Sequence, residues 1–183
     1  GHGGRGGDDF PSHRGGPVYG DASAPIGPGS GGKSIDARTG NMAGNGGGSV
    51  RINATGNVRI DGVITADGGA GAGYSAAGSG GAIWINCLTF EGNGVLRAEG
   101  NEGPSRPWGG SGGGRIAVIY DAVAQAELPV PDALFSVRGG LTPAGGRTRD
   151  GDIGTLYFTD TQFITPVMRY SGQLVFASEP TEL

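Results

Sequence analysis

Residues 78–114, GSGGAIWINCLTFEGNGVLRAEGNEGPSRPWGGSGGG, place a short apolar block between two glycine-rich runs. The strand-like piece at 83–86 (IWIN) has a counterpart thirty-three residues earlier at 50–53 (VRIN) and another thirty-three residues later at 116–118 (IAV). A block that repeats at a fixed spacing and is too small to bury its own apolar face should stack on its copies. The sequence is therefore more informative about architecture than about chemistry.

Glycine dominates the composition. The chain has 183 residues, a length that fits one domain or at most two, and 42 of them are glycine, about three times the usual share. The net charge is only −4, and the apolar residues are gathered into short alternating blocks, which favours order over disorder. Glycine is costly to fix in one conformation, so we interpret the glycines as sites of close backbone packing. The glycine period of collagen is absent.

Several classes of protein are excluded or disfavoured by the remaining composition. The single cysteine, Cys87, excludes an internal disulfide and sits in an apolar run, which favours a buried small side chain. No apolar run approaches the roughly 18 residues of a membrane span, and no basic stripe suits nucleic acid. The chain begins Gly-His without Met or a signal peptide, so we interpret it as a mature fragment or an excised repeat.

The chain divides into three segments by composition. Residues 1–34 are rich in Gly and Pro and predict an extended segment packed on the repeats. Residues 35–160 carry the repeats, with an insertion at 121–132 that predicts a short helix ending at Pro129. Residues 161–183 predict further strands that cap the repeats or contact another subunit or the next module.

Each repeat contains up to three short alternating pieces separated by turns. Equivalent pieces should pair in register, so that Ile64 lies on Leu96. The expected core columns consist of Val50, Ile52, Ile64, Ile83, Ile85, Leu96, Ile116, Val118, Phe135, Leu156 and Phe158. This pattern predicts an all-β fold, a short glycine-rich parallel β-helix of about four coils with an extended N-terminal segment and a less regular C-terminal β cap. A bundle of polyglycine II helices is the alternative, and the regular alternation argues against it.

The order GHGGRGG, GSGGAIWIN, SGGGRIAVIYD and GTLYF resembles the glycine-rich parallel β-helix regions of large secreted and cell-surface proteins, mainly bacterial. The resemblance covers about residues 1–160. It implies an extracellular scaffold or adhesive module, and it brings no catalytic or ligand residues with it.

Metal binding and catalysis find little support. One calcium-binding nonapeptide pattern begins at Gly3, but that motif works in tandem and no second copy follows. The weak metal candidates are His2, Asp8, Asp9 and His13. We predict no cofactor, with calcium as the alternative. We also predict no enzyme, because Asp36 and Glu99 stand isolated between glycines and no serine or cysteine has a histidine in recognisable context.

Outward aromatic residues are the better candidates for contact with a partner or a glycan. Trp84 and Tyr157 occupy equivalent outward positions, Arg51 lies in the same column, and Trp108 lies in a loop. The alternative is that residues 1–34 or the insertion cover them. Asn53 begins an N-glycosylation sequon, but it also matches Asn86, and stacked asparagines hydrogen-bond along a column.

These patterns together predict a non-catalytic structural module of an extracellular or cell-surface assembly, with filament formation among its uses. Its expected partners are other copies of the chain, neighbouring modules of the same large protein, or glycans, and neither nucleic acid nor a membrane span is expected. A carbohydrate-binding adhesin or receptor-binding module is the alternative.

Overall fold

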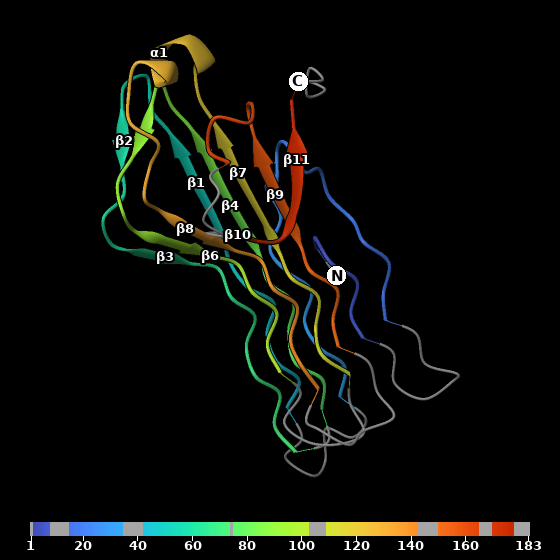
Figure 1. The fold of residues 1–183 in the computed structure, drawn as a ribbon. Helices are drawn as coiled ribbons and strands as arrows, with labels where there is room; N and C mark the ends of the chain where they lie inside the picture. Colours follow the sequence, from blue (N-terminus) through green and yellow to red (C-terminus); the bar gives the residue numbers. More distant parts are fainter. Residues whose placement is uncertain are drawn as a thin grey trace.

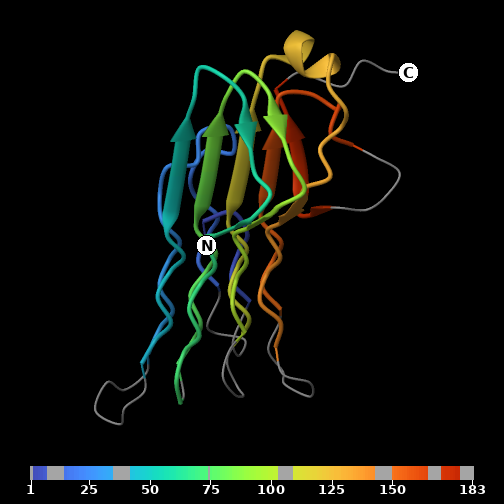
Figure 2. The ribbon, with the colours of Figure 1, turned by 90° about the vertical axis from the view of Figure 1, so that its left-hand side faces the viewer.

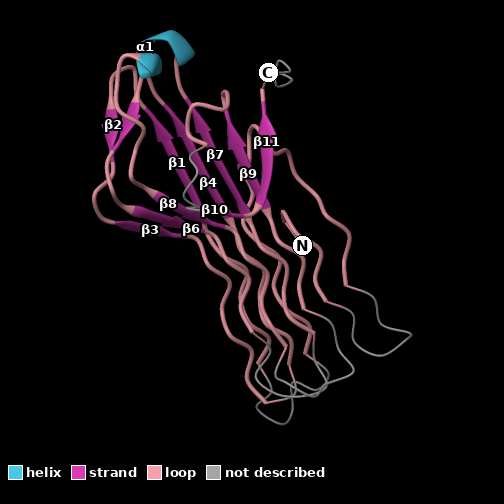
Figure 3. Ribbon diagram, viewed as in Figure 1, coloured by secondary structure: helices cyan, strands magenta, loops and turns pink. Residues whose placement is uncertain are grey.

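The computed structural model describes residues 2–7, 15–34, 42–73, 75–102, 109–142, 150–164 and 170–177. The described residues form two halves, one made of short strands and the other of glycine-rich segments without strands (Figures 1 and 3). The chain passes repeatedly between the halves. From residue 42 onward each described glycine-rich segment leads directly into or out of a strand, whereas residues 2–7 and 15–34 precede the first strand.

Three parallel sheets make up the first half. The largest sheet has the order β1-β4-β7-β9-β11, a second has the order β10-β8-β6-β3, and a third pairs β2 with β5. The strands of the first sheet are β1 (Ser49–Asn53), β4 (Ala82–Asn86), β7 (Arg115–Ile119), β9 (Thr155–Phe158) and β11 (Gln173–Phe176). The others are β2 (Val58–Arg59), β3 (Val63–Thr65), β5 (Phe90–Glu91), β6 (Val95–Arg97), β8 (Leu134–Ser136) and β10 (Tyr170–Ser171).

The strands pair in the register that the repeat predicts. Ile64 lies opposite Leu96, as expected, and Leu96 lies opposite Phe135. The inward side chains of the sheets form one shared core. Its fully enclosed members include Ile83, Ile85, Leu96, Ile116, Val118, Leu156 and Phe158. Val50, Ile52 and Ile64, at the edge strands, are only partly buried. Aromatic rings fill the interior beside β5, β8 and β9, where Phe90, Phe135, Phe158 and Phe163 contact one another.

The glycine-rich half is held together by backbone hydrogen bonds at a three-residue step. The N–H groups of Gly29 and Gly32 donate to the carbonyls of Gly47 and Gly44, each at 2.8 Å. The same step recurs in the pairs Gly4–Gly113 and Gly7–Gly110, Gly44–Ala76 and Gly47–Ser79, and Gly78–Gly69 and Gly81–Ala66. Three residues per turn and bonds only between segments are the properties of the polyproline II helix. We call this half the glycine bundle, and Figure 2 shows its segments continuing beyond the strands.

The glycine bundle needs glycine because its segments touch backbone to backbone. A Cβ atom on Gly113 would lie 1.9 Å from the carbonyl oxygen of Val137 and 2.7 Å from the nitrogen of Gly154. Real Cβ atoms do not approach other atoms so closely, so a side chain here would force the segments apart. The sequence-based interpretation of the glycines as sites of close backbone packing is thereby confirmed at this position.

The expected all-β parallel β-helix is wrong. The fold is mixed, with three separate parallel sheets, strands of two to five residues and the helix α1 (Ala122–Ala126). The third sheet stops after two strands, and α1 follows β7 where a third strand would have continued it. The glycine-rich half of each repeat has no side chains with which to fill a coil. It packs instead in the polyglycine manner that the alternation of the apolar blocks argued against.

Helix α1 closes the third sheet with one side chain. Asp121 caps the helix by accepting hydrogen bonds from the N–H groups of Val123 and Ala124 at 3.0 and 2.9 Å. Gln125 is buried, and its Oε1 accepts from the N–H of Phe90 at 2.8 Å while its Nε2 donates to the Phe90 carbonyl at 3.2 Å. The amide of Gln125 thus satisfies the backbone groups of β5 that a further strand would otherwise pair.

The two ends of the chain join the same framework. Residues 2–7 bond to 110–113 in the glycine bundle, and residues 29–32 bond to 44–47. At the other end, β10 pairs with β8 and β11 pairs with β9. Within the described residues, none of the helical structure is long and apolar enough to cross a membrane.

Candidate functional site

The outward column of the five-stranded sheet contains the aromatic residues singled out in the sequence. Arg51, Trp84, Ala117, Tyr157 and Val175 lie opposite one another in consecutive strands. Trp84 and Tyr157 are both half-buried, and Ala117 is completely buried. The column therefore brings Arg51, Trp84 and Tyr157 onto one face, as the repeat predicts, while Trp108 lies outside the described residues.

Trp84 is engaged within the chain. Its indole N–H donates to the carbonyl oxygen of Ser23 at 3.2 Å, and the guanidinium of Arg51 lies 4.6 Å from the ring centroid. A cation at this distance from an indole face is attracted by the ring quadrupole. The N-terminal segment thus covers Trp84, which was the alternative to a free contact surface. Arg51 forms the exposed part of this pair.

The same face holds a buried cluster between the N-terminal segment and β7, which contains Arg115 and His2. Arg115 is 6% exposed and donates to the hydroxyl of Thr155 at 3.0 Å and to the carbonyl of Tyr19 at 3.0 Å. His2 is 2% exposed, packs edge-on against Tyr19 and finds no hydrogen-bond partner for either ring nitrogen among the described residues. Burial, together with the nearby Arg115 charge, lowers the pKa of His2 to about 4. At neutral pH His2 is therefore an uncharged packing residue.

The weak metal candidates are not brought together by the described residues. His2 lies in the buried cluster, and Asp8, Asp9 and His13 lie outside the described part of the chain. Across the described ranges, no three His, Cys, Asp or Glu side chains gather into a group that could hold a metal ion.

Asn53 and Asn86 form the hydrogen bond that the matching positions suggest. The Nδ2 of Asn86 donates to the Oδ1 of Asn53 at 2.9 Å. Both strands end at these asparagines, which lie opposite each other in the ladder. Asn53 is exposed, and this bond uses its oxygen rather than the nitrogen to which a sugar would be attached. The hydrogen bond to Asn86 therefore leaves the Nδ2 of Asn53 available as a glycosylation acceptor.

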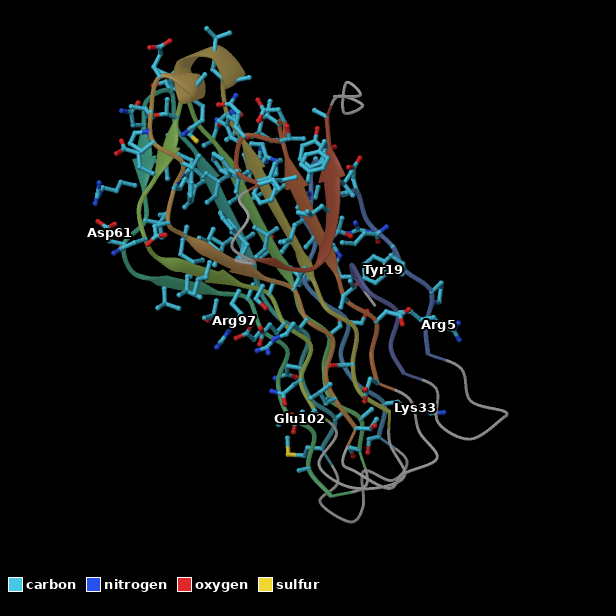
Figure 4. The ribbon with its side chains drawn as sticks, in the orientation of Figure 1. Arg5, Tyr19, Lys33, Asp61, Arg97 and Glu102 are labelled. Atoms are coloured by element: carbon cyan, nitrogen blue, oxygen red, sulfur yellow. The ribbon has the colours of Figure 1, made fainter. Side chains whose placement is uncertain are left out.

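Glu99 is a member of an ion-pair network, so its description as isolated between glycines is wrong. Its carboxylate accepts from Arg138 at 2.9 Å and from the hydroxyl of Ser136, and Asp67 pairs with Arg97 on the neighbouring rung at 2.7 Å. Burial opposes ionisation of Glu99, but the bonds from Arg138 and Ser136 outweigh it and lower the pKa. Figure 4 places Arg97 where the sheets meet the glycine bundle, so the network braces this junction.

The thiol of Cys87 is placed as a structural group. Cys87 is 7% exposed, its sulfur donates to the carbonyl of Ile119 at 3.7 Å, and burial raises its pKa to about 11. A thiol that stays protonated at neutral pH is a poor nucleophile and a poor metal ligand.

The two edge strands of the five-stranded sheet, β1 and β11, each have a neighbouring strand on one side alone among the described residues. Among the described residues, β1 pairs only with β4 and β11 pairs only with β9. The sequence predicted that residues 161–183 cap the repeats or contact another subunit or the next module, which includes β11, but it did not single out the edge at β1. The sequence contains the signal for both edges. The first and last strands of any stacked repeat have no neighbour on one side, so their apolar side chains remain partly exposed.

Comparison of the chain with family models, with curated proteins and with solved structures found no match. The function must therefore be argued from the geometry of the chain itself.

Proposed function

We propose that the chain is a non-catalytic structural module of an extracellular or cell-surface assembly. The observation that carries this proposal is that one backbone hydrogen-bond network joins the strand ladders to the glycine bundle. Glycine-rich segments bond to their neighbours at a three-residue step, and those at 42–48, 75–81, 109–114 and 150–154 continue into strands that are themselves paired. Such a body resists deformation because no part can move without breaking several bonds at once.

The polar chemistry of the described residues serves the same end. The indole of Trp84, the amide of Gln125, the guanidinium of Arg115 and the carboxylate of Glu99 are each engaged in contacts between segments that are distant in sequence. Groups committed to internal contacts support a mechanical role better than a catalytic one, since catalytic groups must face a substrate. The resemblance to secreted surface proteins and the exposed Asn53 sequon support an extracellular setting.

Amide hydrogen exchange measured on the intact chain tests the proposal. A rigid module predicts that the amides of Gly47, Gly81 and Gly113 exchange as slowly as those of β4 and β7, through opening of the whole framework. Rapid exchange at these glycines, with protection confined to the strands, would contradict it.

A glycan array distinguishes the alternative function. Saturable binding to a carbohydrate that is lost on replacing Tyr157 with Ala would make the chain an adhesive module. The structural proposal expects no binding by either protein. The matched control is Tyr157→Phe, which keeps the aromatic ring.

A further inference from the structure

The two edges of the five-stranded sheet that are unpaired within the described part of the chain, at β1 and β11, are complementary in their hydrogen bonding. On β1, the N–H of Ala54 donates to the carbonyl of Asn86, and the carbonyl of Gly48 accepts from the N–H of Ala82. The backbone N–H and C=O groups of the even-numbered residues of β1 therefore point toward β4. Because alternate residues of a paired strand face opposite sides, the backbone groups of Ser49, Arg51 and Asn53 point to the open side.

The opposite phase holds on β11. The N–H of Gln173 donates to the carbonyl of Gly154, and the N–H of Ala177 donates to the carbonyl of Phe158. The backbone groups of the odd-numbered residues of β11 thus point toward β9. Those of Leu174 and Phe176 consequently point to the open side.

Every pair of neighbouring strands inside the sheet follows one rule. The backbone groups of residues whose side chains point into the core bond to the next strand in the order β1-β4-β7-β9-β11. Gly81 accepts from Arg115, and Gly114 accepts from Thr155, just as Gly48 accepts from Ala82. Leu174 and Phe176 hold the corresponding positions on β11, where they lie opposite Leu156 and Phe158. The open side of β11 is therefore equipped to bond to another β1.

We propose that copies of this chain stack head to tail, with β11 of one copy pairing in parallel with β1 of the next. The register is Gln173 opposite Ser49, Leu174 opposite Val50, Val175 opposite Arg51 and Phe176 opposite Ile52. Four backbone bonds form: Leu174 N–H to Ser49 O, Arg51 N–H to Leu174 O, Phe176 N–H to Arg51 O, and Asn53 N–H to Phe176 O. This contact rests on the proposed structural function and names its partner, a second copy of the chain.

The side chains at the two edges fit this register. Val50 and Ile52 at one end, and Leu174 and Phe176 at the other, pack against the core but are only partly buried. Stacking would continue the two inward columns across the contact and remove these side chains from water. The second sheet runs in the same direction through the repeats, from β3 to β10, and within the described residues each of these end strands also pairs on one side alone. A head-to-tail contact of this kind is heterologous, so repetition gives an open filament or a ring.

Cysteine crosslinking between two different single variants tests the register. Ser49 and Gln173 are both exposed, and in the proposed pair their Cα atoms stand about 4.8 Å apart, within the range of a disulfide. Mixing Ser49→Cys with Gln173→Cys under mild oxidation should give a crosslinked heterodimer, and neither variant alone should crosslink efficiently. The control mixture of Ser49→Cys with Val175→Cys is two residues out of register and should give at least tenfold less product. Equal yields from both mixtures, or no product from either, would overturn the proposal.

Sedimentation velocity tests the edge itself. The wild-type chain should form larger species as its concentration rises, and Arg51→Pro should abolish them because it removes an N–H that faces the open edge. Arg51→Ala is the control, since it removes the same cation from Trp84 but keeps the N–H and should still associate. Association of Arg51→Pro equal to that of Arg51→Ala would contradict the proposal. A wild-type chain that stays monomeric up to about millimolar concentration, where even weak self-association of ~4 kcal/mol is populated, would do so as well. Hydrogen exchange on monomeric Arg51→Pro keeps the test of the structural function separate from this one.

Discussion

Replacement of Gln125 by Met should destabilise the chain far more than its place on a five-residue helix suggests. Methionine keeps the length of the buried side chain but can neither accept from the N–H of Phe90 nor donate to its carbonyl. Phe90 is completely buried, so water cannot replace these bonds in the folded state. Each unsatisfied backbone group costs about 1–3 kcal/mol, so we expect a loss of about 2–6 kcal/mol.

Urea unfolding followed by circular dichroism measures this loss. With a denaturant dependence of about 2 kcal/mol per molar for a chain of this size, the midpoint should fall by roughly 1–3 M. Val123→Ala is the matched control on the same helix, since Val123 is 80% exposed and its replacement should change stability by less than about 0.5 kcal/mol. A midpoint for Gln125→Met within error of the wild-type value would refute the reasoning that the amide of Gln125 substitutes for a strand.

Gln125→Glu adds a pH-dependent test of the same contact. A glutamate is isosteric with glutamine but, when ionised, presents its charge to the carbonyl oxygen of Phe90. Burial and this carbonyl should raise the folded-state pKa of the new carboxyl above its unfolded value of about 4.3. The protonated side chain can both donate and accept, so the deficit relative to wild type should be small below pH 4.3 and grow as pH rises through the folded pKa. A deficit that is independent of pH would show that the two bonds to Phe90 are not the source of the effect.

Three further predictions concern other parts of the framework. Since the pKa of His2 is lowered from 6.5 to about 4, the unfolded state takes up the proton first, and stability present above pH 6.5 should be lost progressively down to pH 4, on the order of 1–2 kcal/mol after allowance for solvent screening. His2→Phe should remove this part of the acid dependence in urea titrations at each pH, and an unchanged profile would contradict the assignment. Gly113→Ala should lower the free energy of unfolding by at least about 3 kcal/mol, because its Cβ would collide with the carbonyl of Val137. The control Gly56→Ala, with no atom within 4 Å of its Cβ, should be neutral or stabilising by up to about 1 kcal/mol. Equal thermal midpoints for the two variants would refute the close packing at Gly113. Ile85→Asp places a carboxylate at a fully enclosed core position and should abolish the folded circular dichroism spectrum at 25 °C, so an unchanged melting curve would mean that the inward register is wrong.

The strand half of the molecule could be predicted from the sequence because its signal is local and repeated. Alternation at Ile83 and Ile85 identifies which side chains face inward, and the repeat spacing aligns them with Val50 and Ile52. A parallel ladder in this register then places each inward apolar residue beside its counterpart in the next repeat. The hydrogen bond between Asn53 and Asn86 follows from the same alignment, because equivalent residues of adjacent rungs must be neighbours.

The glycine half could not be predicted with the same method. Glycine has no side chain, so alternation, which reports the direction of side chains, is silent about where glycine-rich segments lie. Their partners are chosen by backbone bonds at a three-residue step, and any glycine-rich run can offer such bonds to any other. The sequence therefore indicated that the segments pack closely but not that residues 29–32 would bond to 44–47, or 4–7 to 110–113.

The insertion at 121–132 illustrates a different limit. A short helix there was expected, and α1 is present, but the use of Gln125 as a substitute strand was invisible. A glutamine on a short helix in an insertion normally faces water, and nothing local marks this one as buried. Its role is set by the third sheet, which ends at β5 and leaves Phe90 with backbone groups to satisfy. The same physical demand, that every edge of a ladder be satisfied or covered, is met by a side chain at β5 and is unmet within the described residues at β1 and β11. That difference is the reason to look for a partner at those two edges rather than at the aromatic column, where Ser23 and Arg51 already cover Trp84.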